Sequence, residues 1–362
     1  MNIAYLNTSF RQEGTSGGST HVREFIEHAN RSGHKILVGK YNYHPQAQQL
    51  PDFIFHSYNA LMKCDVIYVR YEGEVTKSMQ LSKFPLNLLP RKPLIVWEFN
   101  ALPDYLLARG FSQETVNKEI SLLSKEAKIS ELAVCVSKPM ASYVDKVLGF
   151  KKTIVVPNGS NPNHLMPGLP IPPRMTYFEN QFNVAWVGSL KEPWANIEIF
   201  LEAANFIWSQ NGKEICFHLI GEHPPEIAQE MPPNVFLYGG QPYNDLPHWL
   251  SAMDVGLILY KDNLNYYGSP IKFFDYLANG LAVISTEQPQ VREILSTIAA
   301  QEFVLNNETS EDLIKAIHTL YFNKEKLEIY KNSVRELILT QYNWERSVNT
   351  IIKELENMVR KN

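Results

Sequence analysis

Short apolar runs alternate with stretches of helical periodicity along the whole chain. Val22, Phe25, Ile26 and Ala29, for example, follow the i, i+3, i+4, i+7 spacing of a helix with one apolar face. The apolar runs, many of them nearly continuous, are typical of parallel strands buried on both faces. They lie at residues 2–7, 35–38, 65–71, 94–100, 131–136, 153–156, 182–187, 215–220, 234–238, 254–260 and 281–285. This alternation predicts an α/β fold with two doubly wound, Rossmann-like parallel-sheet domains.

The domain boundary is predicted from a change in composition. Residues 161–181 contain five prolines and no clear periodicity, which is typical of a connecting segment. We therefore expect an N-terminal domain at residues 1–165, a linker at 166–181 and a C-terminal domain at 182–340. Residues 341–362 are expected to form an amphipathic helix that packs back toward the N-terminal domain. Two such sheets would face each other across a cleft bordered by the carboxyl ends of their strands, where ligands bind.

Length and composition agree with two folded domains. The chain has 362 residues, which is longer than a domain with a single hydrophobic core usually is. Of these residues 44% are hydrophobic and 20% are charged. Its longest apolar runs have six to eight residues, far fewer than the ~20 of a membrane-spanning helix. The first residues lack a basic flank and a cleavage site, so we expect no secretory signal. Cys64, Cys135 and Cys216 are expected to be buried thiols in a reducing cytoplasm.

The net charge of −4 conceals an asymmetry. Up to residue 165 there are 19 Lys and Arg against 14 Asp and Glu, and beyond it 15 against 24. The two halves are therefore expected to bind different partners, although the small basic excess and the lack of a known motif argue against nucleic acid. Residues 77–92 carry four cations, no acid and several apolar side chains. They suit an anionic membrane surface at the inner face of the membrane, and a core helix with a solvated basic edge is the alternative.

One segment has the features of an anion-binding helix start. Ser269 is suited to cap a helix, Pro270 to occupy its first position and Gly280 to end it. Such a helix presents free backbone N–H groups and the positive end of its dipole. Lys272 adds a full positive charge in the first turn, and Asp275 follows at i+3, within reach of a hydroxyl-bearing group. A diphosphate next to a ribose has this layout; a well-capped helix with an incidental ion pair is the alternative.

A second glycine-rich loop, at residues 14–18, follows the first predicted strand. Gly17 and Gly18 allow the backbone to approach a ligand closely, and Ser19 or Thr20 is suited to cap the helix that follows. The loop is neither G-x-G-x-x-G nor a P-loop, so a nicotinamide or ATP site is disfavoured. An ordinary turn between a strand and a helix is the alternative.

Several absences narrow the chemistry. The sequence has no Asp-x-Asp, no His-Glu-x-x-His and no clustered Cys and His, so we expect neither a metal site nor another cofactor. No nucleophile elbow is present either. Charge on a phosphate would then be held by Lys272, the helix dipole and backbone amides. Lys191, in the loop that begins at Gly188, is a second candidate for this role, and a solvated loop lysine is the alternative.

With these residues assembled, the chain resembles glycosyltransferase family 4, whose members are retaining enzymes with the GT-B fold. The resemblance runs nearly from end to end, and its most specific part is the donor motif at residues 269–278, Ser-Pro-Ile-Lys-Phe-Phe-Asp-Tyr-Leu-Ala. The other matching segments are Gly17-Gly18, Gly33-His34-Lys35, Val156-Pro157-Asn158-Gly159, Trp186 to Lys191, and Asn234 to Leu246.

The resemblance implies roles for the donor nucleotide site. Lys272 would bind the diphosphate and Asp275 the ribose hydroxyls. Gln241, Pro242 and Tyr243 would line the base, largely through backbone groups. The remaining residues of this site would be Gly17, Gly18, Gly188, Ser189, Lys191, Ser269, Pro270 and Ile271.

The resemblance also implies contacts with the donor sugar. Tyr267, Gly268 and Ser269 would approach the sugar and the phosphates. Asn100 falls where many members carry a histidine that contacts the sugar, and Glu98 lies beside it, so we regard both as candidate catalytic residues together with Lys272.

Three positions depart from the family pattern. The usual motif has two glutamates eight positions apart, of which the second is Asp275 and the first would be Tyr267. A common arginine of the loop after the first strand of the donor domain is Ser189. These departures concern the sugar contacts and therefore the identity of the donor.

The resemblance implies transfer of a hexose, with UDP-glucose as the first candidate donor, to a saccharide or lipid-linked saccharide in cell-surface polysaccharide synthesis. The configuration at the anomeric carbon would be retained without a metal. Two other functions fit the same features: a GT-B sugar-nucleotide epimerase or phosphorylase, and a non-catalytic two-lobed protein that binds a sugar or nucleotide.

Overall fold

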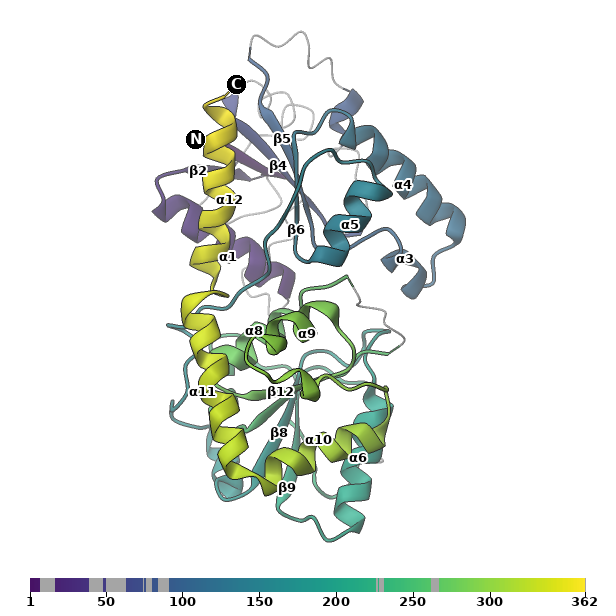
Figure 1. Ribbon diagram of the computed structural model, residues 1–362, viewed down its shortest axis with the longest axis vertical. Helices are drawn as coiled ribbons and strands as arrows, with labels where there is room; N and C mark the ends of the chain where they lie inside the picture. The colour runs from purple at the N-terminus through teal and green to yellow at the C-terminus, as the bar shows by residue number, and fades with distance from the viewer. Residues whose placement is uncertain are drawn as a thin grey trace. The chain divides into compact units, whose positions relative to one another are not determined.

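A computed structural model describes residues 1–6, 17–38, 48–49, 63–73, 75, 80–83, 91–225, 227, 231–261 and 267–361. These residues form two units, whose elements are labelled in Figure 1. The first unit contains Met1–Asn158, Tyr267–Ser269 and Trp344–Asn362, and the second contains Gly159–Tyr266 and Pro270–Asn343.

The first unit is built on a seven-stranded parallel sheet with the order β3-β2-β1-β4-β5-β6-β7. Its strands are β1 (Asn2–Leu6), β2 (Lys35–Val38), β3 (Gln48–Gln49), β4 (Val66–Tyr71), β5 (Leu94–Phe99), β6 (Leu132–Cys135) and β7 (Thr153–Val155). Its helices are α1 (Gly17–Arg31), α3 (Tyr105–Ala108), α4 (Gln113–Ala127), α5 (Lys138–Lys146) and α12 (Trp344–Val359), with a 3₁₀ turn η2 at Leu81–Lys83.

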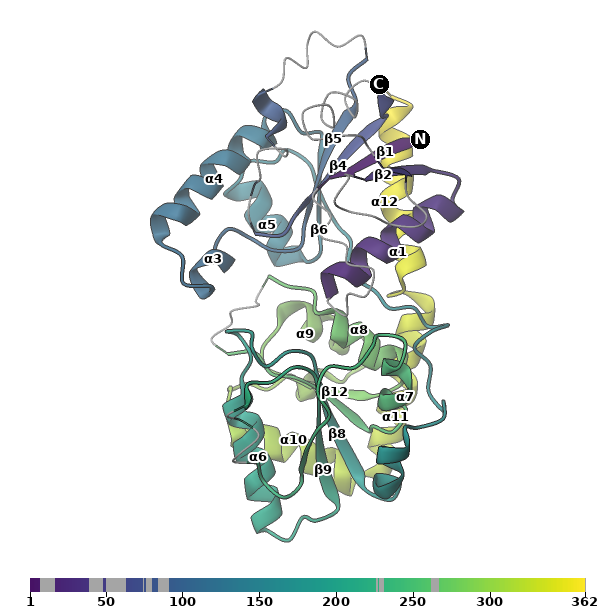
Figure 2. The ribbon, with the colours of Figure 1, turned by 180° about the vertical axis from the view of Figure 1, so that it is seen from behind.

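Two hydrophobic layers cover the faces of this sheet. Side chains alternate along β1, so that Ala4 and Leu6 pack with residues of α4 and α5 on one face. Ile3 and Tyr5 pack on the other face with residues of α1 and α12. Figure 2 shows α1 and α12 side by side on that face, which places the end of the chain in the first unit.

The second unit is built on a five-stranded parallel sheet with the order β10-β9-β8-β11-β12. Its strands are β8 (Phe182–Val187), β9 (Ile215–Ile220), β10 (Val235–Leu237), β11 (Val255–Ile258) and β12 (Ala282–Ser285). Its helices are α6 (Ile197–Ser209), α7 (Leu246–Leu250), α8 (Ile271–Ala278), α9 (Pro289–Ser296), α10 (Ser310–Phe322) and α11 (Lys324–Thr340), with 3₁₀ turns η4 (Pro173–Phe178) and η6 (Gln301–Phe303). Helix α8 packs on α11 and α6 on α10, and Figure 1 shows α6 and α11 on opposite sides of the sheet.

The predicted fold class, α/β with two parallel sheets, is confirmed. Each apolar run predicted to be a strand contains one in the structure, with ends that differ by up to two residues. Strand β3 is not predicted, because Gln48 and Gln49 are polar and the pairing with β2 involves only two residues.

The division into units differs from the predicted boundaries. The first unit ends at Asn158 rather than at residue 165, and residues 166–181, predicted to be a linker, lie in the second unit. The reason is burial, because the side chains of Leu165 and Met175 are fully enclosed in the core of that unit. The proline-rich composition therefore marks a largely exposed, irregular segment that these two side chains anchor to the second unit.

Residues 77–92, predicted to bind a membrane surface, lie mostly outside the described residues. Of them the structure describes only Gln80 to Lys83, Arg91 and Lys92, and Leu81 is buried in the core of the first unit. Among the described helices none combines the length and the apolar character needed to cross a bilayer.

Gly256 lies inside β11, directly under the ring of Tyr276 on α8. A Cβ atom at Gly256 would lie 2.4 Å from that ring, closer than any real contact. The hydroxyl of Tyr276 accepts a hydrogen bond from the Val187 amide (2.8 Å), so this ring holds α8 against the end of β8. Because Gly256 has no side chain, Tyr276 and with it α8 can pack closely against β11.

We expect Gly256→Ala to lower the free energy of unfolding by about 1–3 kcal/mol, because overpacking must displace Tyr276 and α8. Urea unfolding of the full chain measures this change. Gly240→Ala is the matched control, since its Cβ would meet only the side chain of Glu222 at an ordinary 3.6 Å. Equal stability of the two variants would contradict the proposed packing.

Candidate active site

In a doubly wound sheet, ligands bind at the carboxyl ends of the strands, where the strand order reverses. In the second unit this point lies between the neighbouring strands β8 and β11. The strand after β8, β9, lies on one side of this pair, and the strand after β11, β12, lies on the other side. The loops that follow these two strands, and the helix α8 that follows β11, are therefore the first place to look for a binding site.

Lys272, in the first turn of α8, extends to this point. Its Nζ atom lies 5.3 Å from the ring centroid of Trp186 in β8 and 5.6 Å from that of Tyr260, just after β11. Both distances are within the range of cation–π attraction. No described residue places a hydrogen-bond acceptor or a carboxylate within bonding distance of this ammonium group. The ammonium group is thus held in place by two aromatic rings and is available to an anion.

The environment of Lys272 also changes its protonation. Burial disfavours the charged form and lowers the pKa of Lys272 to about 8, while the charge of Glu192 partly opposes this effect. A bound anion would favour the charged form again. Donor binding is therefore expected to be linked to proton uptake near this pH.

Two glycines bring the loop after β8 close to Lys272. Gly188 has a φ of +120°, and a Cβ atom there would lie 3.1 Å from Lys272 Nζ. A Cβ atom at Gly221 would lie 2.0 Å from the carbonyl oxygen of Gly188, so the loops after β8 and β9 are in backbone contact. Both positions require glycine, and Gly188 is one of the predicted nucleotide-binding residues.

The start of α8 differs in detail from the prediction. Pro270, not Ser269, is the N-cap residue, and α8 begins at Ile271 without a side-chain cap. The Ser269 hydroxyl accepts a hydrogen bond from the Asn158 amide (3.1 Å) instead. The first N–H groups of α8 have no partner within the helix, as in any helix, and they lie beside Lys272. Gly280 follows the C-cap with a φ of +71°, as predicted.

The side chains of Asp275 and Lys272 contact different residues, although they are only three positions apart in the sequence. The Asp275 side chain is buried, and its Oδ1 atom accepts a hydrogen bond of 2.7 Å from the hydroxyl of Ser160. A ribose hydroxyl that binds this carboxylate must therefore share it with Ser160.

Lys191 and Ser189 lie in the exposed part of the loop after β8. Lys191 Nζ donates to Glu222 Oε2 at 2.9 Å, and both side chains are more than half exposed. The Ser189 hydroxyl accepts a hydrogen bond from the Lys191 amide within a local turn (3.1 Å). Lys191 thus already has an acidic partner, whereas Lys272 has none among the described residues.

The predicted base-binding residues lie in the loop after β10. Gln241 donates to the Tyr238 carbonyl (2.7 Å), which leaves its own carbonyl oxygen for a ligand. Pro242 is exposed, and the ring of Tyr243 stacks on His164 with the centroids 5.0 Å apart. This segment is held in place by contacts within the second unit.

The remaining predicted residues lie in the first unit. Gly17 and Gly18 form the exposed start of α1, so Ser19 and Thr20 lie within the helix and do not cap it. The rest of that glycine-rich loop lies outside the described residues. Asn100 follows β5, and its buried Nδ2 atom has no hydrogen-bond partner among the described residues. Its amide is therefore available to a ligand.

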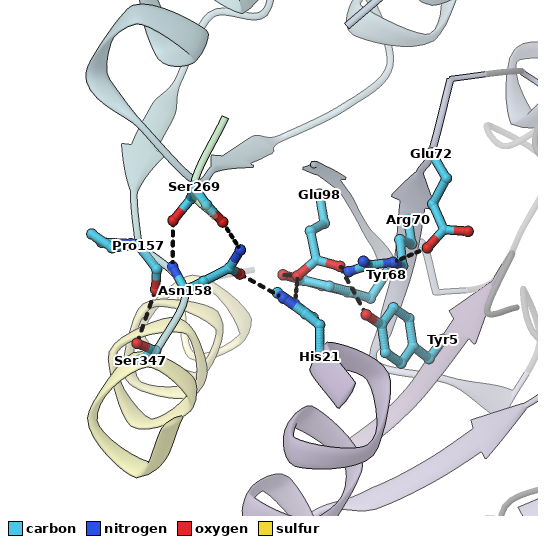
Figure 3. A network of polar contacts seen from close by, with 10 residues as sticks. All are labelled: Tyr5, His21, Tyr68, Arg70, Glu72, Glu98, Pro157, Asn158, Ser269 and Ser347. Carbon is cyan, nitrogen blue, oxygen red and sulfur yellow. Dashed lines mark hydrogen bonds and ion pairs between the residues drawn. The ribbon is translucent and has the colours of Figure 1, made fainter. Parts of the chain in front are cut away.

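Glu98, in β5, is enclosed by polar side chains from β1, β4 and α1 (Figure 3). Its side chain is 1% exposed. One carboxylate oxygen contacts His21 Nε2 (2.7 Å) and the hydroxyl of Tyr68 (3.1 Å). The other accepts from the hydroxyl of Tyr5 (2.8 Å) and from Arg70 (2.8 Å). Neither oxygen is open to a substrate, so the prediction that Glu98 takes part in the reaction does not fit its surroundings.

The charges around Glu98 keep it ionised. Burial alone would raise the pKa of this carboxyl, but the charges of His21 and Arg70 and the hydrogen bonds from His21 and Tyr5 lower it far below its usual value. Burial, followed by the Glu98 charge, raises the pKa of Tyr5 and of Tyr68 well above the ordinary value, so both hydroxyls donate. This network is a fixed, paired cluster and not a proton-transfer site.

The segment Tyr267–Ser269 belongs to the first unit and is held by hydrogen bonds there. The side-chain Nδ2 of Asn158 donates to the Ser269 carbonyl at 2.6 Å. The hydroxyl of Ser137 donates to the Tyr267 carbonyl at 2.6 Å, and the Tyr267 ring packs edge-on against Tyr143. The residues predicted to approach the donor sugar are thus placed by side chains far away in the sequence.

The motifs of the sequence do not indicate the roles of His21, Asn158 or Arg70. Arg70 and Glu98 each interrupt an apolar strand with a charge, and opposite charges in neighbouring buried strands indicate a pair. This signal could have identified their contact. Among the described residues, no group of three or more His, Cys, Asp or Glu is arranged to hold a metal ion.

Comparisons with known proteins agree with this architecture. Residues 181–323 match the family Glycosyl transferases group 1. No curated protein matches the chain. Sucrose-phosphate synthase from Thermosynechococcus elongatus is similar in structure, with a TM-score of 0.76, 15% identity and full coverage of both chains. HepE from Anabaena, solved with UDP and glucose, has a TM-score of 0.72 and 15% identity, with 99% of this chain and 100% of that chain covered.

A third similar structure is WaaG, a glycosyltransferase involved in lipopolysaccharide biosynthesis, with a TM-score of 0.66 and 12% identity, covering 96% of this chain and 98% of that one. These structures share the GT-B fold of two parallel-sheet α/β units. The family match covers most of the second unit, which contains Lys272 and α8. Residues 181–323 thus resemble a glycosyltransferase family, and the whole chain shares the GT-B fold.

Proposed function

We propose that this protein is a glycosyltransferase that moves a hexose from a UDP-sugar, with UDP-glucose as the first candidate, to a saccharide or lipid-linked saccharide acceptor with retention of configuration. The observation that carries the proposal is the Lys272 ammonium group, which lies at the strand switch point of the second sheet without an acidic partner among the described residues. The similar HepE structure, which was solved with UDP and glucose, supports the choice of base and sugar.

The proposed donor site lies in the second unit. Lys272 and the first N–H groups of α8 bind the diphosphate, Asp275 together with Ser160 binds the ribose, and the loop at Gln241–Tyr243 lines the base. Gly188 allows the phosphates to approach closely beside Lys272. Asn100, whose Nδ2 lacks a described partner, is the proposed sugar contact.

Charge separation is the costly step of the proposed reaction. The bond between the anomeric carbon and the β-phosphate oxygen breaks, and a bond to the acceptor hydroxyl oxygen forms on the same face. The proton of that hydroxyl passes to the departing diphosphate. Lys272 and the start of α8 stabilise the negative charge that develops on this leaving group, and they do so in a partly buried site where electrostatic effects are strong.

A thermal-shift panel of UDP, GDP and ADP, each free and as the glucose conjugate, tests the donor class. We expect UDP and UDP-glucose to raise the unfolding temperature most, because a ligand that binds only the folded state stabilises it. Slow hydrolysis of UDP-glucose, followed by NMR of the released sugar, then distinguishes an enzyme from a binding protein. The absence of stabilisation by any of the nucleotides would contradict the proposed donor site.

UDP binding should take up a fraction of a proton at pH 8. Lys272 is partly neutral at that pH because its pKa is lowered to about 8, and a bound diphosphate favours the charged form. We expect an uptake of about half a proton, falling toward zero at pH 6, where Lys272 is already charged. Isothermal titration calorimetry in two buffers with different ionisation enthalpies measures it. The same uptake in Lys272→Met would show that another group is responsible.

A further inference from the structure

His21 joins the buried Glu98 network to the backbone of the Tyr267–Ser269 segment (Figure 3). Its Nε2 atom lies 2.7 Å from Glu98 Oε1, and its Nδ1 atom lies 2.8 Å from Asn158 Oδ1. Asn158 in turn contacts Ser269 twice, through its backbone N–H and through its side-chain Nδ2. A chain of hydrogen bonds therefore runs from Glu98 through His21 and Asn158 to Ser269.

The direction of each hydrogen bond in this chain follows from the chemistry of its ends. The carbonyl of Ser269 can only accept, so the atom of Asn158 that faces it is the NH₂ group. The carbonyl oxygen of the Asn158 side chain must then face His21, and His21 Nδ1 must donate to it. At the other end Glu98 is ionised and can only accept, so His21 Nε2 also donates. Both ring nitrogens carry a proton, and His21 is an imidazolium cation.

The surroundings of His21 balance this charge. Glu98 from β5 faces it directly, and Arg70, Tyr5 and Tyr68 from β4 and β1 contact the same carboxylate. Arg70 also pairs with Glu72 at 2.6 Å, so two cations, His21 and Arg70, meet two anions.

Among the residues that the structure describes, the other elements packed around His21 bring no charge into the cluster. From α12 the ring of Trp344 packs edge-on against His21, with the centroids 5.0 Å apart, and the hydroxyl of Ser347 donates to the Pro157 carbonyl. On α1 the next ionisable residues are Arg23 and Glu24, which pair with each other at 3.6 Å. In a neutral imidazole one ring nitrogen carries a lone pair and no proton. That nitrogen would face an oxygen of Glu98 or Asn158, and one hydrogen bond of the chain would be lost.

We propose that His21, as an imidazolium, is a positioning residue for donor binding: it orients the Asn158 amide, which holds the Tyr267–Ser269 segment in its binding conformation. This inference rests on the proposed function, in which Tyr267, Gly268 and Ser269 approach the donor sugar and phosphates. His21 itself contacts neither donor nor acceptor in this account. It acts only through Asn158.

The ionisation of His21 can be observed in the unaltered protein. In ¹⁵N-histidine NMR at pH 7.5 we expect one buried histidine with protons on both ring nitrogens, and this signal should vanish in His21→Gln. His318 on α10 serves as the neutral reference, because burial lowers its pKa. A signal assigned to His21 that shows a single ring proton at this pH would overturn the proposal, and this result does not depend on whether a variant folds.

Two variants separate the links of the chain. His21→Gln removes one of the two donors, whereas Asn158→Asp keeps an acceptor for His21 and replaces the NH₂ group that binds Ser269 by a charged oxygen that repels the Ser269 carbonyl. We expect each variant to lower kcat/KM for the donor about tenfold to a hundredfold, the usual range for a lost hydrogen bond with a charged partner. The KM for the acceptor should stay unchanged, and Asn158→Asp should keep the imidazolium signal. A change in thermal stability alone, without a change in donor KM, would show that the cluster is merely structural.

Matched controls are His318→Gln and Asn349→Asp, whose side chains lie outside the network, and neither should alter the kinetics for the donor. The outcomes also separate this inference from the proposed function. If Lys272→Met leaves UDP affinity unchanged, the proposed donor site is wrong. If Lys272→Met weakens UDP binding while His21→Gln and Asn158→Asp do not, only the positioning role is wrong.

Discussion

Replacing Lys272 by methionine should lower the turnover of the donor by about 10²–10³, the usual effect of removing one group that stabilises a developing negative charge. Methionine keeps most of the length of the side chain, so it can still reach Trp186 and Tyr260, but it carries no charge. The affinity for UDP should fall as well. Steady-state kinetics with UDP-glucose and calorimetry with UDP measure the two effects.

The same substitution should raise stability, and this opposite sign distinguishes lost function from lost folding. The folded state lowers the pKa of Lys272 from 10.5 to about 8, so the charge is more costly in the folded than in the unfolded chain at neutral pH. Because the ammonium keeps part of its hydration, we expect a gain of roughly 1 kcal/mol in the free energy of unfolding. Lys191→Met is the matched control, since that exposed side chain already pairs with Glu222. Wild-type turnover in Lys272→Met would exclude the proposed role of this residue.

Glu98→Ala should be the most destabilising single substitution in the first unit. It leaves Arg70 and His21 buried without their shared partner, and breaking a buried ion pair typically costs about 3–5 kcal/mol. Urea unfolding at pH 7 measures the loss. Glu354→Gln is the control, since its ion pair with Lys152 on the surface contributes little.

The pH dependence of stability provides a second test of the same cluster. The pKa of Glu98 is lowered in the folded state, so its contribution is fully present above the unfolded pKa of about 4.5. It is lost progressively as the pH falls below that value, because the unfolded chain then binds a proton that the folded chain does not. Glu98→Gln should remove this part of the acid destabilisation. An unchanged acid unfolding profile in Glu98→Gln would contradict the paired state of the carboxylate.

The elements and the charged helix start could be predicted because their signals are local. Apolar runs such as the one at 215–220 are long enough to identify a buried strand without further information. Gly280 and Lys272 likewise follow from the rules for helix ends and charges. The predicted N-cap, Ser269, is one residue too early. Its hydroxyl accepts a hydrogen bond from the amide of Asn158, which is far away in the sequence.

The complete Glu98 network could not be predicted because its members come from four elements, β1, α1, β4 and β5, that are far apart in the sequence. Tyr5, Tyr68 and Glu98 lie on three strands, and only the strand order β1-β4-β5 brings their side chains together. Glu98 therefore looked like a catalytic carboxylate beside Asn100, since a sequence does not show that both of its oxygens are occupied. The unit boundary was misplaced for a related reason, because proline content does not report the burial of Leu165.

The donor diphosphate is proposed to bind at Lys272 and the start of α8, and a crystal structure of the protein with UDP would show whether it does. We expect a phosphate oxygen about 3 Å from Lys272 Nζ, with further contacts to the first amides of α8. A diphosphate bound elsewhere, with Lys272 still facing only Trp186 and Tyr260, would contradict it.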